Sequence, residues 1–215
     1  METSLRASSK EKLFRLFSAL QRNWDRLAVA ALALCLALGL WWGFLRSRPH
    51  AEMQLRRQLV LTAQDYLGCK EEDGSYLPIL EAYNTQESLP RGYSVTADDS
   101  WCAVFATVAA RQAGLGQIVP PECSCGQMIE LFREQGTWVE ADWYLPRPGD
   151  YIFYDWDNAS RRDSTGWPDH VGIVVRTFGP VIKVIEGNKD DMVTYRYVFL
   201  DDVWIRGYGT PDFAP

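Results

Sequence analysis

The sequence predicts an α+β domain, with helices first and an antiparallel β-sheet of about five strands second, preceded by a single transmembrane helix. Three observations predict this fold class. Apolar residues recur at helical spacing as far as Gly136. From Tyr151 onward, β-branched and aromatic runs are separated by Gly, Pro, Asp and Asn. Near the start of the chain, the 19 residues 27–45 carry no charge.

This uncharged run is long enough to cross a bilayer. As an α-helix rising about 1.5 Å per residue it reaches about 28 Å, close to the ~30 Å of the hydrocarbon core. Six basic residues precede the run, whereas Arg46 and Arg48 are the basic residues just after it. The asymmetry favours a cytoplasmic N-terminus and an extracytoplasmic domain. A cleaved signal peptide, cut within residues 37–39, is the alternative.

We therefore expect four segments in the chain. Residues 1–26 are a basic cytoplasmic tail, residues 27–45 a signal anchor in the cell membrane, residues 46–58 a juxtamembrane segment, and residues 59–215 the catalytic domain. Residues 1–50 hold 8 of the 22 Lys and Arg and 3 of the 28 Asp and Glu, which leaves 14 basic and 25 acidic residues after them. This acidic balance argues against a nucleic-acid partner for the domain.

Helices are predicted throughout the first half of the domain. An amphipathic helix ending near Gly68 is indicated by apolar residues at helical spacing, namely Leu55, Leu59, Ala63 and Leu67. A short helix over residues 77–84 follows. After the double proline at residues 120–121, a further amphipathic helix contains Met128 and Phe132 and closes at Gly136.

Cys102 is the candidate nucleophile, because a helix is predicted to begin beside it. Asp98, Asp99 and Ser100 are favoured N-cap residue types, and neither Pro nor Gly interrupts residues 101–113. Unpaired amide N–H groups and the helix dipole favour a thiolate in the first turn, which lowers the pKa of a thiol from its usual ~8.5. The alternative is a small buried helix cysteine without a chemical role.

A cysteine nucleophile needs an imidazole base, and the chain has two histidines. His50 sits beside the basic end of the uncharged run, far from any folded core, so His170 is the candidate base. Glu186 and Asn188 lie near the end of a later strand, where alternation places both on one face. Either can orient the imidazole, and charge favours Glu186, since a carboxylate also stabilises an imidazolium.

Five β-branched and aromatic runs predict the strands of the sheet. They are Tyr151 to Trp156, Val171 to Phe178, Val181 to Glu186, Met192 to Leu200 and Val203 to Tyr208. The short connection Phe178-Gly179-Pro180 predicts a hairpin between the second and the third run.

Four segments in this order and at these spacings resemble the CHAP family of cysteine, histidine-dependent amidohydrolases and peptidases, within the papain-like superfamily. They are DDSWCAVF, PRPGDYIFYDW, PDHVGIV and VIEGN, and upstream AQDYLGCKEEDGS and EAYN are also similar to the opening of some CHAP domains. The likeness covers about 150 residues, from Leu59 to Pro211. It implies a papain-like fold in which the cysteine helix packs against the sheet that carries the histidine.

The resemblance implies a thiol hydrolase acting on amide bonds of cell-wall peptidoglycan, either between muramic acid and the stem peptide or within the peptide. Cys102 would attack, His170 would move the proton, and Glu186 would orient His170 with lesser support from Asn188. No metal or organic cofactor is implied. Two alternatives keep the fold: a catalytically silent wall-binding or scaffold domain, and an acyl transferase that uses the same thioester.

Two tryptophans are the candidate substrate-binding residues. Trp101 stands beside the nucleophile, and Trp167 lies in the polar loop of residues 157–169 that leads to His170. Such a loop often sets specificity, and Arg161 and Arg162 share it. A solvated insertion without a role in binding is the alternative for the whole loop.

The other domain cysteines leave three alternatives open. Outside the cytoplasm, Cys69 is expected to pair with Cys123 or Cys125. Three free thiols are the second alternative. A zinc site that uses all three is the third, and it would need a fourth ligand.

Overall fold

The structure is a computed structural model that describes residues 28–41, 50–141, 143–156 and 166–214. The chain divides into two compact units, Met1–His50 and Ala51–Pro215. In the first unit, residues 28–41 form a helix with exposed side chains. The predicted basic tail of residues 1–26 and residues 46–49 of the predicted juxtamembrane segment lie outside the described residues, whereas residues 50–58 of that segment are helical.

The predicted transmembrane helix is wrong as part of the fold. Among the described residues, no helix is both long enough and apolar enough to span a bilayer. The helix over residues 28–41 has 14 residues, which at a rise of about 1.5 Å each reach about 21 Å. The predicted span requires one continuous helix over residues 27–45, and the two ends of that run lie outside the described residues. The cytoplasmic N-terminus and the extracytoplasmic domain stay predictions.

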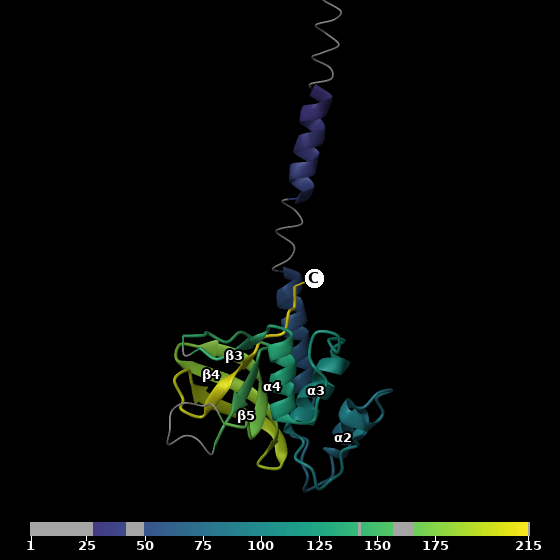
Figure 1. Cartoon of the computed structure of the whole chain (residues 1–215), viewed down its shortest axis with the longest axis vertical. Helices are drawn as coiled ribbons and strands as arrows, with labels where there is room; N and C mark the ends of the chain where they lie inside the picture. The colour runs from purple at the N-terminus through teal and green to yellow at the C-terminus, as the bar shows by residue number, and fades with distance from the viewer. Residues whose placement is uncertain (1–27, 42–49, 142, 157–165, 215) are drawn as a thin grey trace, which may run out of the picture. The chain divides into compact units, whose positions relative to one another are not determined.

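The second unit has the α+β order that the sequence predicts. The unit opens with residues 51–64 of a helix that begins at residue 50. The elements that follow are α2 (Leu77–Asn84), the 3₁₀ turn η1 (Pro90–Gly92), α3 (Cys102–Gln112), α4 (Cys125–Glu134), β1 (Trp138–Val139), β2 (Tyr151–Tyr154), β3 (His170–Phe178), β4 (Val181–Lys189), β5 (Met192–Phe199) and β6 (Ile205–Gly209). Figure 1 shows α2 and α3 to one side of the strands.

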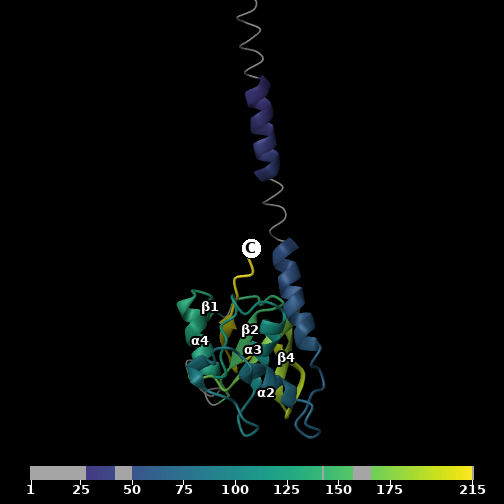
Figure 2. The same cartoon turned by 90° about the vertical axis from the view of Figure 1, so that its right-hand side faces the viewer.

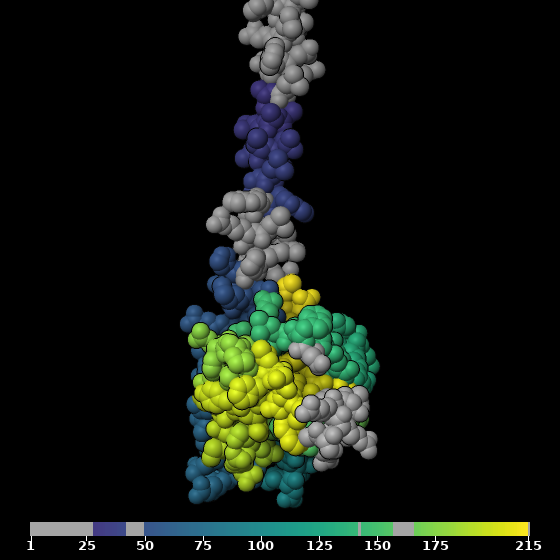
Figure 3. Space-filling view, turned by 90° about the vertical axis from the view of Figure 1, so that its left-hand side faces the viewer, coloured from purple at the N-terminus to yellow at the C-terminus, as the bar shows by residue number. Residues whose placement is uncertain are grey.

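In the described part of the chain the sheet has six strands rather than about five, in the order β1-β6-β2-β3-β4-β5, and every neighbouring pair is antiparallel. The additional strand is β1, whose two residues pair with β6. A two-residue strand is too short for an alternating pattern to reveal it. The green-to-yellow C-terminal half, which holds most strands, forms much of the face in Figure 3.

The main core lies between the sheet and the helix α3, which packs against β3 and β4. Nine of the 11 residues of α3 are buried, so this helix has almost no solvated face. A smaller cluster, which includes Ile152, Val184 and Tyr208, packs on the other side of the sheet. Figure 2 shows α3 in front of β2 and β4. A helix buried to this degree is held rigidly, which suits the candidate nucleophile that the sequence predicts at its start.

The start of α3 is built differently from the sequence expectation. The N-cap residue is Trp101, with no side-chain cap of its own. Asp99 instead accepts hydrogen bonds from the backbone N–H of Thr96 and from the hydroxyl of Tyr93. The Trp101 backbone N–H donates to Asn188 Oδ1 at 3.3 Å, from the end of β4. A side chain distant in the sequence therefore supports the helix start.

Gly187 sets how closely α3 approaches β4. A β-carbon at this glycine would lie 2.5 Å from the β-carbon of Phe105 in α3. An added methyl group would therefore push the backbone of β4 away from the helix α3. We expect Gly187→Ala to lower the free energy of unfolding by about 1–3 kcal/mol. Urea unfolding followed by circular dichroism measures the change. Gly116→Ala is the control, since Gly116 has no positive φ and the atom nearest to a β-carbon there is Cγ of the exposed Arg111 side chain at 3.3 Å. An equal loss in both variants would contradict the close approach.

Candidate active site

Cys102 is the first residue of α3 and is 4% exposed. Its thiol interacts with the Cys125 thiol, the His170 imidazole and the backbone N–H of Val171. The hydrogen bond from Cys125 lowers the pKa of Cys102 most, and burial opposes it. The hydrogen bond and positive charge of His170 then bring the pKa well below its ordinary value. This is the environment of a thiolate rather than of an inert core thiol.

His170 is the first residue of β3 and is 8% exposed. Its Nε2 lies 3.0 Å from Oε2 of Glu186 in the neighbouring strand β4, which leaves Nδ1 for Cys102. Burial alone would lower the pKa of His170, but the hydrogen bonds and charges of Cys102 and Glu186 raise it to about 9. The imidazole is therefore held as an imidazolium between two anionic groups at neutral pH.

Gly172 makes room for the carboxylate that reaches His170. A β-carbon at Gly172 would lie 2.7 Å from Cγ of Glu186. Because His170 and Gly172 are two residues apart on one strand, their positions share a face of the sheet. The missing side chain at residue 172 leaves the space through which Glu186 extends toward the ring of His170.

The structure adds Arg196, which sequence reasoning missed. Its Nε lies 2.8 Å from each carboxylate oxygen of Glu186, and Glu186 is fully buried. The guanidinium also lies over the rings of Trp156 and Tyr154, 5.0 and 5.5 Å from their centroids. The ion pair offsets the cost of burying a carboxylate. An arginine ten residues after Glu186, across a strand pair, carries no short-range signal in the sequence.

Asn188 lies near Trp101 and Glu71 rather than at the imidazole. Besides accepting from the Trp101 N–H, it donates from Nδ2 to Glu71 Oε1 at 3.1 Å, and Glu71 also accepts from Trp101 Nε1 at 2.8 Å. Asn188 has a φ of 56°, so the strand no longer alternates here. The two predicted orienting residues are thus separated: Glu186 contacts His170, and Asn188 contacts the N-cap of α3.

The two candidate substrate-binding tryptophans differ in exposure. Trp101 is fully buried, so a substrate cannot contact its ring without a rearrangement. Trp167 is 64% exposed, and its indole lies so close to Gly126 in α4 that a β-carbon there would collide with it. Gly126 follows Cys125, so Trp167 stands at the rim of the site. Arg161 and Arg162 lie outside the described residues.

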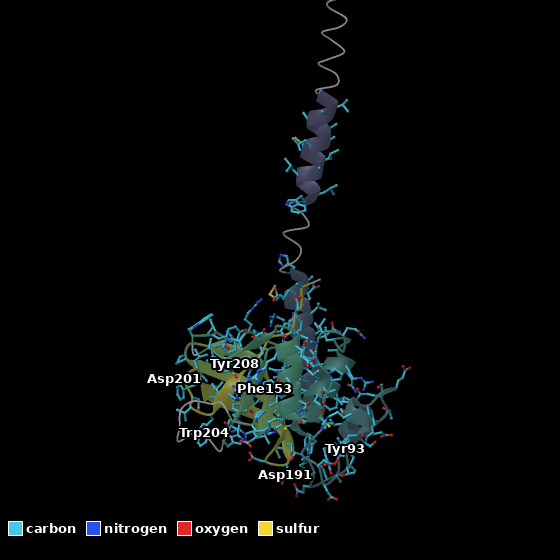
Figure 4. All side chains as sticks on the ribbon, in the orientation of Figure 1. Tyr93, Phe153, Asp191, Asp201, Trp204 and Tyr208 are labelled. Carbon is cyan, nitrogen blue, oxygen red and sulfur yellow. The ribbon has the colours of Figure 1, made fainter. Side chains whose placement is uncertain are left out.

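Two further aromatic residues connect the site to the surface. The ring of Trp156 lies 6.4 Å from that of His170, and the ring of Trp204 lies 5.7 Å from that of Trp156. Trp204 is 36% exposed. Figure 4 shows Trp204 on the strand side of the unit and Tyr93 on the helix side. These side chains offer apolar contact area beside His170.

All five cysteines, each within the described residues, are free thiols. The expected bridge from Cys69 is therefore not present. Cys125 lies with its Sγ 3.6 Å from that of Cys102, where it belongs to the site. Among the described residues, no group of three His, Cys, Asp or Glu side chains is placed to hold a metal ion.

The comparisons with known proteins do not assign the chain to a family. No family model matches the sequence, and no curated protein sequence matches it. A crystal structure of Ly7917 is similar at 17% identity with a TM-score of 0.35, over 63% of this chain and 60% of that chain. A crystal structure of Ly7917 with the hydrolyzing product of MDP gives 17% identity and a TM-score of 0.37, over 63% and 61%. The chain thus spans about three fifths of the structures that it matches, and TM-scores this low establish no common fold.

The lowered pKa of Cys102 predicts its reactivity toward iodoacetamide. Because the thiolate is the reacting form, alkylation of Cys102 should reach its maximum at a lower pH than alkylation of Cys69. The Cys69 thiol, whose pKa burial raises, should react faster only as the pH rises further. Peptide mass spectrometry measures both rates in one sample. In Cys125→Ala the inflection for Cys102 should move to higher pH, and an unchanged inflection would contradict the role given to Cys125.

Proposed function

We propose that this chain is a cysteine hydrolase that cleaves amide bonds of cell-wall peptidoglycan, either between muramic acid and the stem peptide or within the peptide. One observation carries the chemistry: a cysteine at the start of a buried helix interacts with an imidazole that is itself bonded to a buried carboxylate. The peptidoglycan substrate rests on the resemblance of four sequence segments to CHAP enzymes. Since peptidoglycan lies outside the cytoplasmic membrane, the proposal includes an extracytoplasmic place of action.

In the proposed acylation step, the Cys102 thiolate attacks the carbonyl carbon of the amide. The backbone N–H of Cys102, at the first position of α3, has no carbonyl partner inside the helix and is a donor for the developing oxyanion. The His170 imidazolium then donates its proton to the departing amine. The C–N bond breaks, and a thioester joins the acyl group to Cys102.

In the deacylation step, the now neutral His170 takes a proton from water, which attacks the thioester carbonyl. Collapse of the tetrahedral intermediate releases a carboxylate and restores the Cys102 thiolate beside the imidazolium. Glu186 contributes at both stages, because its charge stabilises the imidazolium and its bond to Nε2 fixes the ring. Trp167 and Trp204 are the exposed residues placed to contact the peptide.

The test is to incubate the full-length chain with purified peptidoglycan and to identify the products by mass spectrometry. Hydrolysis gives one new amine and one new carboxylate at a single class of amide bond. A new amide in place of the carboxylate would show acyl transfer. A silent wall-binding domain would sediment with the wall and release nothing. Absence of any new terminus, while Cys102 remains reactive to iodoacetamide, would overturn the proposed function.

A further inference from the structure

Cys125 lies beside the candidate nucleophile, and besides lowering the pKa of Cys102 it places a second thiol there that the proposed hydrolysis does not use as a reactant. It is the first residue of α4, as Cys102 is the first residue of α3. The two Sγ atoms lie 3.6 Å apart, although 23 positions separate the residues in the sequence. Both residues are buried, at 4% and 8% exposure. Two helix starts thus bring two thiols into contact beside one imidazole.

We propose that Cys102 and Cys125 form a reversible oxidation site, in which a hydroperoxide converts the two thiols into a disulfide. A disulfide has an S–S bond of about 2.05 Å, so the sulfur atoms must approach by roughly 1.5 Å. Rotation about the Cα–Cβ bonds moves a sulfur atom by this distance without breaking either helix. The proposal shares the reactive Cys102 thiolate with the proposed function but does not depend on peptidoglycan as the substrate.

The first step uses the Cys102 thiolate as the nucleophile. It attacks one oxygen of the hydroperoxide, the O–O bond breaks, and Cys102 becomes a sulfenic acid, oxidised by two electrons. The peroxide is reduced to hydroxide or alkoxide, which takes up a proton. Selective reaction at Cys102 is expected, because thiolate character decides which cysteine is oxidised first.

The second step joins the two residues. The Cys125 sulfur attacks the sulfenic sulfur of Cys102, an S–S bond forms and the S–O bond breaks. The proton of Cys125 leaves with the hydroxide as water, and His170, in contact with Cys102, is placed to relay it. Over both steps, two thiols and one hydrogen peroxide give one disulfide and two waters. Two molecules of a small thiol restore both cysteine thiols by thiol–disulfide exchange through a mixed disulfide, and are themselves oxidised to a disulfide.

The environment of Cys125 favours this order of events. The hydrogen bond and charge of the Cys102 thiolate are the first and third causes that raise the pKa of Cys125, with burial between them. Before oxidation, Cys125 is therefore kept protonated. When Cys102 becomes a neutral sulfenic acid, that negative charge disappears, and the Cys125 proton is lost more easily. The resolving thiol becomes nucleophilic only when there is a sulfenic acid for it to attack.

The consequence for the enzyme is protection of the nucleophile. A sulfenic acid without a neighbouring thiol is oxidised further to sulfinic and sulfonic acids, which small thiols do not reduce. A disulfide stops this sequence, at the expense of temporary inactivation. Under oxidising conditions the site would thus be closed rather than destroyed, and it would reopen when reducing thiols return.

To test this, the full-length chain is exposed to increasing concentrations of hydrogen peroxide, and the peroxide is then removed with catalase. The chain is denatured, its free thiols are alkylated, and it is digested with trypsin without reduction of its disulfides. Cys102 lies in the tryptic peptide of residues 92–111, and Cys125 in that of residues 112–133. The second peptide also contains Cys123, so the matched control is Cys123→Ser. Wild type and Cys123→Ser should both give the two peptides joined by a disulfide.

Cys125→Ser should give no such disulfide and should accumulate sulfinic and sulfonic Cys102 instead. After treatment with dithiothreitol, free Cys102 thiol should be about tenfold more abundant in wild type than in Cys125→Ser. Loss of the disulfide in Cys123→Ser, or its persistence in Cys125→Ser, would overturn the assignment. So would over-oxidised Cys102 without a disulfide in wild type. These readouts report the state of the thiols, so they stand whether or not the chain cleaves peptidoglycan.

Discussion

The Cys102→Ala variant is expected to lose hydrolysis of peptidoglycan by at least about 10⁴-fold, because it removes the atom that attacks the amide carbonyl. The fold should survive. Alanine is the best helix former and replaces a small side chain at the first position of α3. Release of new amines from purified peptidoglycan measures the activity, and thermal unfolding followed by circular dichroism measures the fold.

Cys69→Ala is the matched control for this variant. Cys69 is a half-buried thiol outside the site, and its backbone pairs with Val193 whatever its side chain. This control should keep its activity within about twofold. Hydrolysis that persists in folded Cys102→Ala would exclude a cysteine mechanism. Loss of folding in Cys102→Ala but not in Cys69→Ala would instead indicate that Cys102 is a packing residue without a catalytic role.

The second large effect is expected for Glu186→Gln. Glutamine keeps the shape of the side chain and removes the negative charge that lies 3.0 Å from His170 Nε2. The thiolate and the oxyanion donor remain, so we expect kcat to fall roughly 10- to 1,000-fold, less than on loss of the nucleophile. The variant also leaves Arg196 without its carboxylate partner, so unfolding must be measured beside turnover.

A pH profile separates a charge effect of Glu186 from a purely structural one. The pKa of His170 is about 9, so the imidazolium needed as an acid is lost as the pH rises through that value. The wild-type kcat/KM should therefore fall above about pH 9. In Glu186→Gln the imidazolium loses a stabilising charge, its pKa falls, and the alkaline limb should move to lower pH. A limb that stays in place would show that the charge of Glu186 does not act on His170.

Asn188→Ala distinguishes the two predicted orienting residues. Asn188 contacts the N–H of Trp101 and the carboxylate of Glu71, so its loss should loosen the start of α3 and cost less turnover than Glu186→Gln. If Glu186→Gln is nearly silent and Asn188→Ala is crippled with its fold unchanged, the third residue of the site is Asn188.

The sequence is most informative about this domain where a local pattern decides the structure. Residues 77–84 form the predicted helix α2, which has a proline in its first turn, a position typical of helix starts. The strand that begins with His170 and the strand that carries Glu186 were predicted from β-branched runs, and the pairing of β3 with β4 brings these two residues together. The catalytic roles of Cys102, His170 and Glu186 stay predictions.

The features of the candidate site that could not be predicted from the sequence depend on contacts between residues that are far apart in the chain. Cys125 lies beside Cys102 because α3 and α4 converge at their first residues, and no spacing within one element indicates this. Arg196 reaches Glu186 only through the register of β4 with β5. Asn188 does not share the strand face of Glu186, because its positive φ interrupts the alternation of side chains along the strand. At residues 27–45 the sequence predicted too much structure rather than too little. Their uncharged composition predicted a helix that spans the membrane, whereas the described helix covers residues 28–41 and is not long and apolar enough to do so.

Trapping of the acyl group tests most directly whether Cys102 acts through a thioester. Hydroxylamine competes with water for a thioester and converts the acyl group into a hydroxamate. Wild-type chain digesting peptidoglycan in increasing hydroxylamine should release a rising fraction of hydroxamate at the cleaved bond, and Cys102→Ala should release none. Amine release that yields only carboxylate at every hydroxylamine concentration, or hydroxamate formed equally by Cys102→Ala, would contradict the mechanism.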